Sequence, residues 1–116
     1  MYIDTRAIGF PLTEAIRLHV ESRLNGALAP VSSQVILVTA RVEDVNAGRG
    51  GEDKRCRFVA LLAGRGTVLA EATSADLYTA VDRAARRLRT ITLRAIRRPY
   101  AADRKDPQRP GALLTA

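Results

Sequence analysis

The first third of the chain combines a short strand-like pattern with a longer helical pattern. Apolar and polar positions alternate weakly over residues 2–9, and this alternation predicts a short strand. Residues 13–28 carry apolar side chains at helical spacing and therefore predict an amphipathic helix. Thr13 stands at the N-cap position of this helix, and Pro30 stops it. Its apolar stripe consists of Ile16, Val20, Leu24 and Ala27.

The middle of the chain has the pattern of three consecutive strands. Residues 34–45 are rich in β-branched side chains, and their even positions from Ile36 to Val42 are apolar, which predicts a half-buried strand. A tight turn is expected at residues 64–66, where two glycines flank an arginine, and residues 67–73 form the third strand. The second strand lies between these two, after the glycine-rich stretch, and its apolar face consists of Cys56, Phe58, Ala60 and Leu62.

The strongest periodic signal predicts a second helix over residues 75–98. Ser74 stands at its N-cap position, and Pro99 ends it. Its apolar positions recur at alternating steps of four and three, and Leu93 is expected to point outward, away from this stripe. The stripe consists of Leu77, Val81, Ala84, Leu88, Ile91 and Ala95.

The order of elements is therefore β-α-β-β-β-α, which predicts an α+β fold. Each helix has one apolar stripe and the sheet has one apolar face, so the simplest packing places both helices on one face of a four-stranded sheet. We expect residues 1–98 to form a single domain. Residues 99–116 contain three prolines and lack a periodic pattern, so we expect a flexible C-terminal tail there.

The composition favours a polyanionic partner over a membrane. The 116 residues include 19 Lys and Arg against 12 Asp and Glu, which gives a net charge of +7 and makes nucleic acid the leading candidate. A single cysteine excludes an intrachain disulfide, and no run of apolar residues resembles a signal segment or a membrane span, so we expect a cytoplasmic protein. Aromatic residues are 4% of the chain, which argues against binding single strands mainly by stacking on aromatic side chains.

The second predicted helix concentrates much of this positive charge. From residue 83 to residue 98 the chain has seven arginines and no acid, whereas a solvated helix face normally mixes both signs. Arginine binds phosphate through two parallel hydrogen bonds, so we interpret this face as a phosphate-binding surface rather than a merely soluble one. The candidate RNA-binding residues on this helix are Arg83, Arg86, Arg87, Arg94, Arg97 and Arg98.

The glycine-rich stretch at residues 46–58 (NAGRGGEDKRCRF) superficially resembles a phosphate-binding loop. A P-loop would require a helix and a Lys-Ser/Thr pair after the glycines, whereas a strand follows here, so we expect a long hairpin loop. Arg49 and Lys54 are secondary candidates for binding a polyanion, together with the neighbouring Arg55 and Arg57. Cys56 lies on the apolar face of its strand and is expected to be a core residue rather than a nucleophile.

The sequence offers no constellation of catalytic or metal-ligating residues. His19 is the only histidine and stands at the edge of the first helix's apolar stripe, where we expect a half-exposed packing residue. With one histidine and one cysteine, the usual soft ligands of a zinc site are lacking. We therefore expect a protein that is not an enzyme and has no cofactor, metal or small-molecule substrate.

Two short segments are similar to motifs of a known family. Residues 12–17 (LTEAIR) and 76–82 (DLYTAVD) resemble the starts of both helices in the ribosome hibernation-promoting factor family, also called ribosome-associated inhibitor or sigma-54 modulation protein. The resemblance runs from about residue 3 to residue 94 with the same order of elements. Residues 50–56 (GGEDKRC) resemble a variant branch of this family.

The resemblance implies a translation silencer that binds 16S-type rRNA of the small ribosomal subunit, in the channel for mRNA and tRNA, during stationary phase or stress. Arg87 and Arg94 fall where the family usually has Lys or Arg, whereas Thr90 and Leu93 fall where it is often basic. Two alternatives stay open at this point. One is a general binder of structured RNA, and the other is a protein-interaction regulator that does not bind ribosomes.

Overall fold

The computed structural model describes residues 1–45 and 53–98. The expectations for Arg49 and for the tail at 99–116 lie outside these ranges. The elements of the described ranges are β1 (Tyr2–Ile8), α1 (Glu14–Leu28), the 3-10 helix η1 (Ala29–Gln34), β2 (Val35–Asp44), β3 (Lys54–Leu62), β4 (Gly66–Ser74) and α2 (Leu77–Arg97). This order confirms the predicted β-α-β-β-β-α pattern, with η1, which contains Pro30, as an addition.

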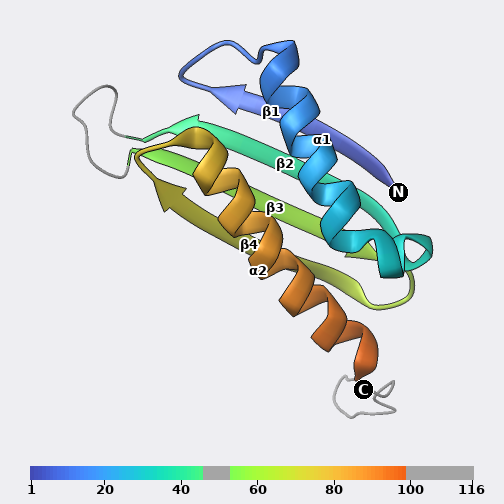
Figure 1. The fold of residues 1–116 in the computed structure, drawn as a ribbon. Helices are drawn as coiled ribbons and strands as arrows, with labels where there is room; N and C mark the ends of the chain where they lie inside the picture. The colour runs from blue at the N-terminus through green and yellow to red at the C-terminus, as the bar shows by residue number, and fades with distance from the viewer. Residues whose placement is uncertain (46–52, 99–116) are drawn as a thin grey trace.

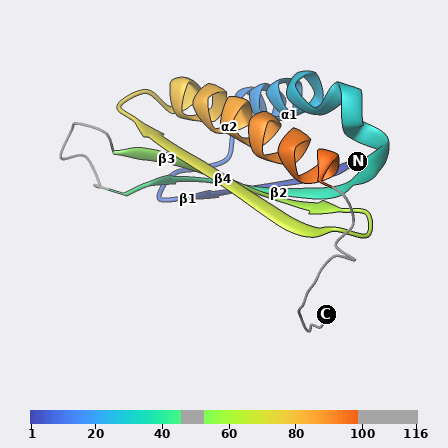
Figure 2. The same ribbon diagram turned by 90° about the horizontal axis from the view of Figure 1, so that it is seen from below.

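The four strands form one sheet in the order β1-β2-β3-β4. β1 runs parallel to β2, because α1 crosses over the sheet between them, and the other two pairings are antiparallel. Figures 1 and 2 show both helices on the same face of this sheet, as the sequence predicted, while the opposite face has no covering layer among the described residues. β1 and β4 are the edge strands.

The core lies between the helices and the sheet. In the register of β2, β3 and β4, Phe58 pairs with Ala40 on one side and with Ala70 on the other. All three are buried, and the large ring stands between two small side chains, so it fills the space beneath the helices. Leu24 of α1 and Leu88 of α2 are also fully buried and complete the same core.

The predicted face of the β2 strand is wrong at its start. Ile36 was expected on the buried face, but it is 48% exposed, whereas Val35 is only 3% exposed. The register with β3 shifts between Val35 and Leu37, and an irregularity of one residue moves a side chain to the other face of a strand. From Val38 to Val42 the even positions are buried as expected.

The helix starts follow different residues in the two cases. The Oγ1 of Thr13 accepts a hydrogen bond from the N–H of Ile16, which confirms the predicted N-cap of α1. The predicted N-cap of α2 is wrong: Ser74 still belongs to β4, where it pairs with Lys54. Asp76 takes the N-cap position instead and accepts hydrogen bonds from Thr79, because the pairing of β4 continues to Ser74 and the helix begins only at Leu77.

Candidate nucleic-acid interface

The arginines of α2 lie on the outer side of a helix whose inner side is buried. Val81, Ala84 and Leu88 face the core, and every arginine from position 83 to position 98 is exposed. Within the described residues, no carboxylate forms an ion pair with any of them. The face therefore keeps its positive charge, as the sequence pattern predicted. The seven residues are Arg83, Arg86, Arg87, Arg89, Arg94, Arg97 and Arg98.

Two of these arginines cap the free edge of the sheet. Arg83 Nη1 donates to the backbone carbonyl of Thr73 at 3.2 Å, and Arg87 Nη1 donates to that of Glu71 at 2.7 Å. Four helical residues advance by about 6 Å and two strand residues by about 6.8 Å, so the two ladders match. This edge-capping role was not predicted from the sequence, although two arginines four residues apart after a terminal strand are a usable signal.

Two further arginines bind backbone carbonyls at helix ends. Arg89 Nη1 donates to the carbonyl of Ala27 at 3.2 Å and so links α2 to the last turn of α1. Arg65, in the turn between β3 and β4, donates through Nη1 to the carbonyls of Ala95 at 3.1 Å and Arg98 at 2.8 Å. Helix C-termini leave carbonyl groups without intrahelical partners, and a cation there also interacts favourably with the helix dipole. Arg65 thus anchors the end of α2 to the sheet.

The remaining four arginines are free of such contacts. In the part of the chain that the structure describes, the side chains of Arg86, Arg94, Arg97 and Arg98 have neither a hydrogen bond nor an ion pair. Their guanidinium groups are therefore available to phosphate oxygens without the loss of an internal contact.

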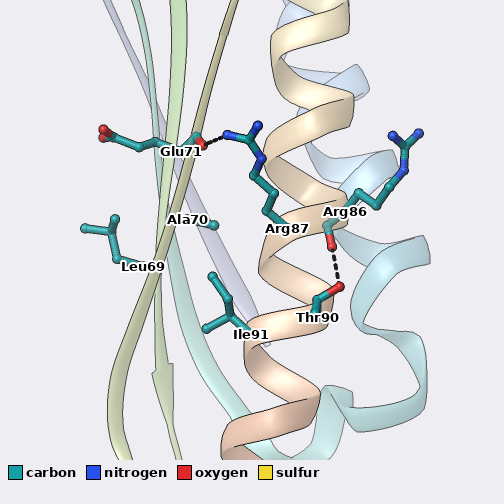
Figure 3. A pocket seen from close by; sticks show the side chains of 7 residues that line it. All are labelled: Leu69, Ala70, Glu71, Arg86, Arg87, Thr90 and Ile91. Carbon is teal, nitrogen blue, oxygen red and sulfur yellow. Dashed lines mark hydrogen bonds between the residues drawn. The ribbon is translucent and has the colours of Figure 1, made fainter.

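Two shallow hollows follow these arginines along α2. The first, which we call the β4–α2 groove, has a volume of ≈ 440 Å³ and lies between the edge strand and the helix (Figure 3). The second has a volume of ≈ 470 Å³, and the two share Thr90. The groove is lined by Leu69, Ala70, Glu71, Arg86, Arg87, Thr90 and Ile91. The second hollow is lined by Thr90, Leu93, Arg94, Arg97 and Arg98.

Leu93 does not project freely outward as the sequence predicted. It is partly buried and packs against the core while it lines the second hollow. The helical wheel placed it opposite the apolar stripe, but it did not include the neighbouring elements, which cover part of the side chain.

The basic residues of β3 differ from those of α2 because acids neutralise them. Lys54 Nζ lies 2.9 Å from an Asp53 carboxylate oxygen and 3.6 Å from one of Asp44, and these acids raise the pKa of Lys54, Asp53 foremost. Arg55 pairs with Glu43 and Arg57 with Glu71, each at 2.8 Å. The unpaired charge of the described residues is thus concentrated on α2.

Cys56 and His19 take part in packing. Cys56 is fully buried, and burial raises the pKa of its thiol, so a reactive thiolate is disfavoured, in agreement with its predicted place in the core. His19 Nε2 lies 2.9 Å from Asp82 Oδ1 at the contact between the helices. Among the residues described, no group of three or more His, Cys, Asp and Glu side chains is arranged to hold a metal ion. In the same ranges, neither helix combines the length and the apolar character that crossing a membrane requires.

The fold and the site together define a small α+β protein that displays an unpaired arginine face on its second helix. The chain belongs to the family described as "Sigma 54 modulation protein / S30EA ribosomal protein", whose model matches residues 3–98. This match confirms the resemblance inferred from residues 12–17 and 76–82. The family indicates a ribosome-associated modulation protein.

Two solved structures resemble the chain over most of its length. A ribosomal subunit interface protein from Coxiella burnetii superposes with a TM-score of 0.73 at 22% identity, over 84% of this chain and 100% of that chain. The N-terminal domain of Thermus thermophilus Protein Y superposes with a TM-score of 0.62 at 28% identity, over 80% of this chain and 93% of that chain. The first likeness supports the fold alone. No curated protein sequence matches the chain significantly.

Proposed function

We propose that this protein is a non-enzymatic, cytoplasmic translation inhibitor that binds rRNA of the small ribosomal subunit in the channel for mRNA and tRNA. It would silence ribosomes during stationary phase or stress. The observation that carries the proposal is the set of α2 arginines that stay exposed and unpaired while the arginines of β3 are neutralised. The family and the ribosomal subunit interface protein among its structural neighbours support the ribosome as the partner.

The four uncommitted arginines, Arg86, Arg94, Arg97 and Arg98, make the primary phosphate contacts in this proposal. Arg83 and Arg87 contribute as well, because each donates a single hydrogen bond to the backbone and a guanidinium carries five N–H groups. Arg49 and Lys54 add secondary contacts, and for Lys54 an approaching phosphate must compete with its two carboxylates. Contacts of this kind recognise folded rRNA by shape and backbone rather than by sequence.

Co-sedimentation with purified small subunits across a salt series tests this function. Binding through several phosphates releases counterions, so we expect saturable binding that weakens steeply as salt rises and that tRNA or mRNA displaces. Binding that changes little with salt would favour a protein-interaction regulator. If free duplex RNA displaces the protein from small subunits as easily as added ribosomes do, the protein is a general binder of structured RNA. No binding at low salt would contradict the proposal.

A further inference from the structure

The capping of the β4 edge stops at the β4–α2 groove. Arg83 donates to the carbonyl of Thr73 and Arg87 to that of Glu71. The next contact at this spacing, four residues along α2 and two along β4, would join residue 91 to Leu69. Residue 91 is isoleucine, which has no donor. The β3–β4 register is regular along the strand, and the outward-facing backbone groups of an antiparallel edge strand recur at every second residue. Leu69 therefore presents its N–H and C=O toward the groove without an arginine to cover them.

The groove combines three kinds of surface. Figure 3 shows the side chains of Leu69 and Glu71 pointing away from α2, while Ala70 and Ile91 lie between the strand and the helix and form an apolar floor. The backbone of Leu69 adds a donor and an acceptor along one wall. The other wall carries the guanidinium group of Arg87, and the rim carries the Thr90 hydroxyl, which donates to the carbonyl of Arg86 at 3.3 Å. Figure 3 shows the Arg86 side chain directed away from β4, so Arg86 borders the groove without placing its guanidinium group in it.

This combination matches the chemistry of an unpaired nucleotide. A nucleobase is a flat, largely apolar ring with donors and acceptors on its edge, and its phosphate lies at one end. The floor suits the ring, the Leu69 backbone suits the edge, and the Arg87 guanidinium suits the phosphate. A double helix keeps its bases stacked inside and offers only its backbone, so it would leave the floor and the Leu69 groups uncovered. Thr90, where the resembled family is often basic, keeps this rim open and uncharged at its centre.

An extended acidic peptide added to β4 is a poorer match. Strand addition requires a run of free backbone groups along the edge. Arg83 and Arg87 already occupy the carbonyls of Thr73 and Glu71, so the uncapped part of the strand is short.

We infer that the β4–α2 groove binds one unstacked RNA nucleotide, with its base on Ala70 and Ile91 and its phosphate on Arg87. The inference rests on the proposed function and narrows it: the rRNA segment held by this face contains an unpaired nucleotide, in a loop, a bulge or a single strand. The second hollow lies on the other side of Thr90, where the bound RNA segment would continue toward Arg94, Arg97 and Arg98.

The test uses a single-stranded RNA of about twelve nucleotides that carries one 2-aminopurine, together with a duplex of the same length. Thr90→Leu fills the groove without changing charge or removing a buried contact, because Thr90 is exposed. Ser22→Leu, at an exposed position of α1, is the matched control. We expect 2-aminopurine fluorescence to rise on binding to the unmodified protein. Thr90→Leu should abolish this rise and weaken single-strand binding about tenfold, the scale of one lost base contact, while duplex affinity stays unchanged. Ser22→Leu should change neither.

Several results would overturn the inference, and they differ in what they leave standing. If both leucine variants bind the single strand like the unmodified protein, the groove does not hold a nucleotide, although arginine–phosphate binding survives. If Thr90→Leu blocks an extended poly-glutamate peptide but not RNA, the groove is a peptide site. If neither RNA nor small subunits bind at low salt, the proposed function itself fails.

Discussion

His19 on α1 and Asp82 on α2 are joined by a hydrogen bond of 2.9 Å between Nε2 and Oδ1. Arg23 Nε lies 3.0 Å from the same carboxylate oxygen, and the ring of Tyr78 meets that of His19 edge to face, with the centroids 4.5 Å apart. Asp82 is the single acid in α2, and it is used to hold α1 rather than to neutralise the arginine face. Asp82 therefore contributes to the contact between the two helices and leaves the charge of the outer face unbalanced.

Asp82→Ala should loosen the contact between the helices without weakening RNA binding directly. Because the carboxylate is partly exposed, we expect a loss of about 1 kcal/mol in the free energy of unfolding, measured by urea denaturation. Glu14→Ala is the matched control, since Glu14 pairs only with Arg17 on the exposed surface of α1. Equal stability of the two variants would contradict a role for Asp82 in holding the helices together.

Charge reversal should show whether ribosome binding depends on the arginine face of α2 or on the basic surface as a whole. Arg86→Glu combined with Arg94→Glu is expected to abolish co-sedimentation with small subunits, and each single variant should lower the salt slope by about one contact or more. The control is Arg41→Glu, because Arg41 is exposed on the uncovered face of the sheet and its reversal changes the net charge equally to each single variant. Circular dichroism should remain unchanged in all of them. If Arg41→Glu is as harmful as Arg94→Glu, binding follows net charge rather than this face.

Arg87→Ala should expose the edge of β4. The variant loses the hydrogen bond to the Glu71 carbonyl, which we expect to cost about 1 kcal/mol in the free energy of unfolding. An uncapped edge strand also favours pairing with another chain, so self-association should increase in sedimentation velocity runs. Arg87→Lys keeps a donor at the same place and should restore much of the monomeric behaviour. Unchanged hydrogen exchange at Glu71 and its neighbours in Arg87→Ala would argue against the capping role.

Arg65→Ala should free the C-terminal end of α2 from the sheet. The carbonyls of Ala95 and Arg98 lose their partner, so amide hydrogen exchange in the last turn should accelerate while the first turns stay protected. The expected cost in the free energy of unfolding is small, about 0.5 kcal/mol, because the site is near the surface. Ribosome affinity should fall through the loss of a fixed position for Arg94 and Arg97. Uniform exchange along α2 in the variant would contradict a local anchor.

The stability of the protein should decrease at acid pH for identifiable reasons. The hydrogen bond from the Thr79 side chain, followed by the one from its N–H, lowers the pKa of Asp76, and the hydrogen bond from Arg57 lowers that of Glu71. A carboxyl whose pKa is lower in the folded state contributes its stability above the unfolded pKa, about 3.9 for Asp and 4.3 for Glu. This contribution is lost as the pH falls through the folded value.

Asp76→Asn distinguishes the contribution of Asp76 to the loss of stability at acid pH from that of Glu71. Asparagine is also a good N-cap, so the variant should stay close to the unmodified protein near neutral pH yet lose less stability below pH ~4. Thermal unfolding from pH 7 to pH 2 measures the difference, and Glu71→Gln should show the remaining part of the slope. An identical pH profile in Asp76→Asn would show that this cap does not titrate as described.

Local patterns in the sequence were sufficient to predict most of the fold. The period of two in the strands and the helical spacing of residues such as Val81 and Leu88 depend only on which face of an element is apolar, and such faces must be buried together. The same reasoning placed the charge of α2 outward. It failed at Ile36 and at Ser74, because a register shift and the continued pairing of β4 depend on partner strands that a local pattern does not contain.

The sequence by itself determined the basic character of this segment, since residues 83–98 contain seven arginines and no acid. Only the tertiary structure decided how these arginines are used. The distance between α2 and the β4 edge brings Arg83 and Arg87 onto carbonyl groups, and the turn between β3 and β4 brings Arg65 onto the helix end. Arg86 and Arg94 are exposed, have no contact of this kind among the described residues and remain available. Partners of this kind are far apart in the chain, so the register and packing of whole elements determine which arginines stay free.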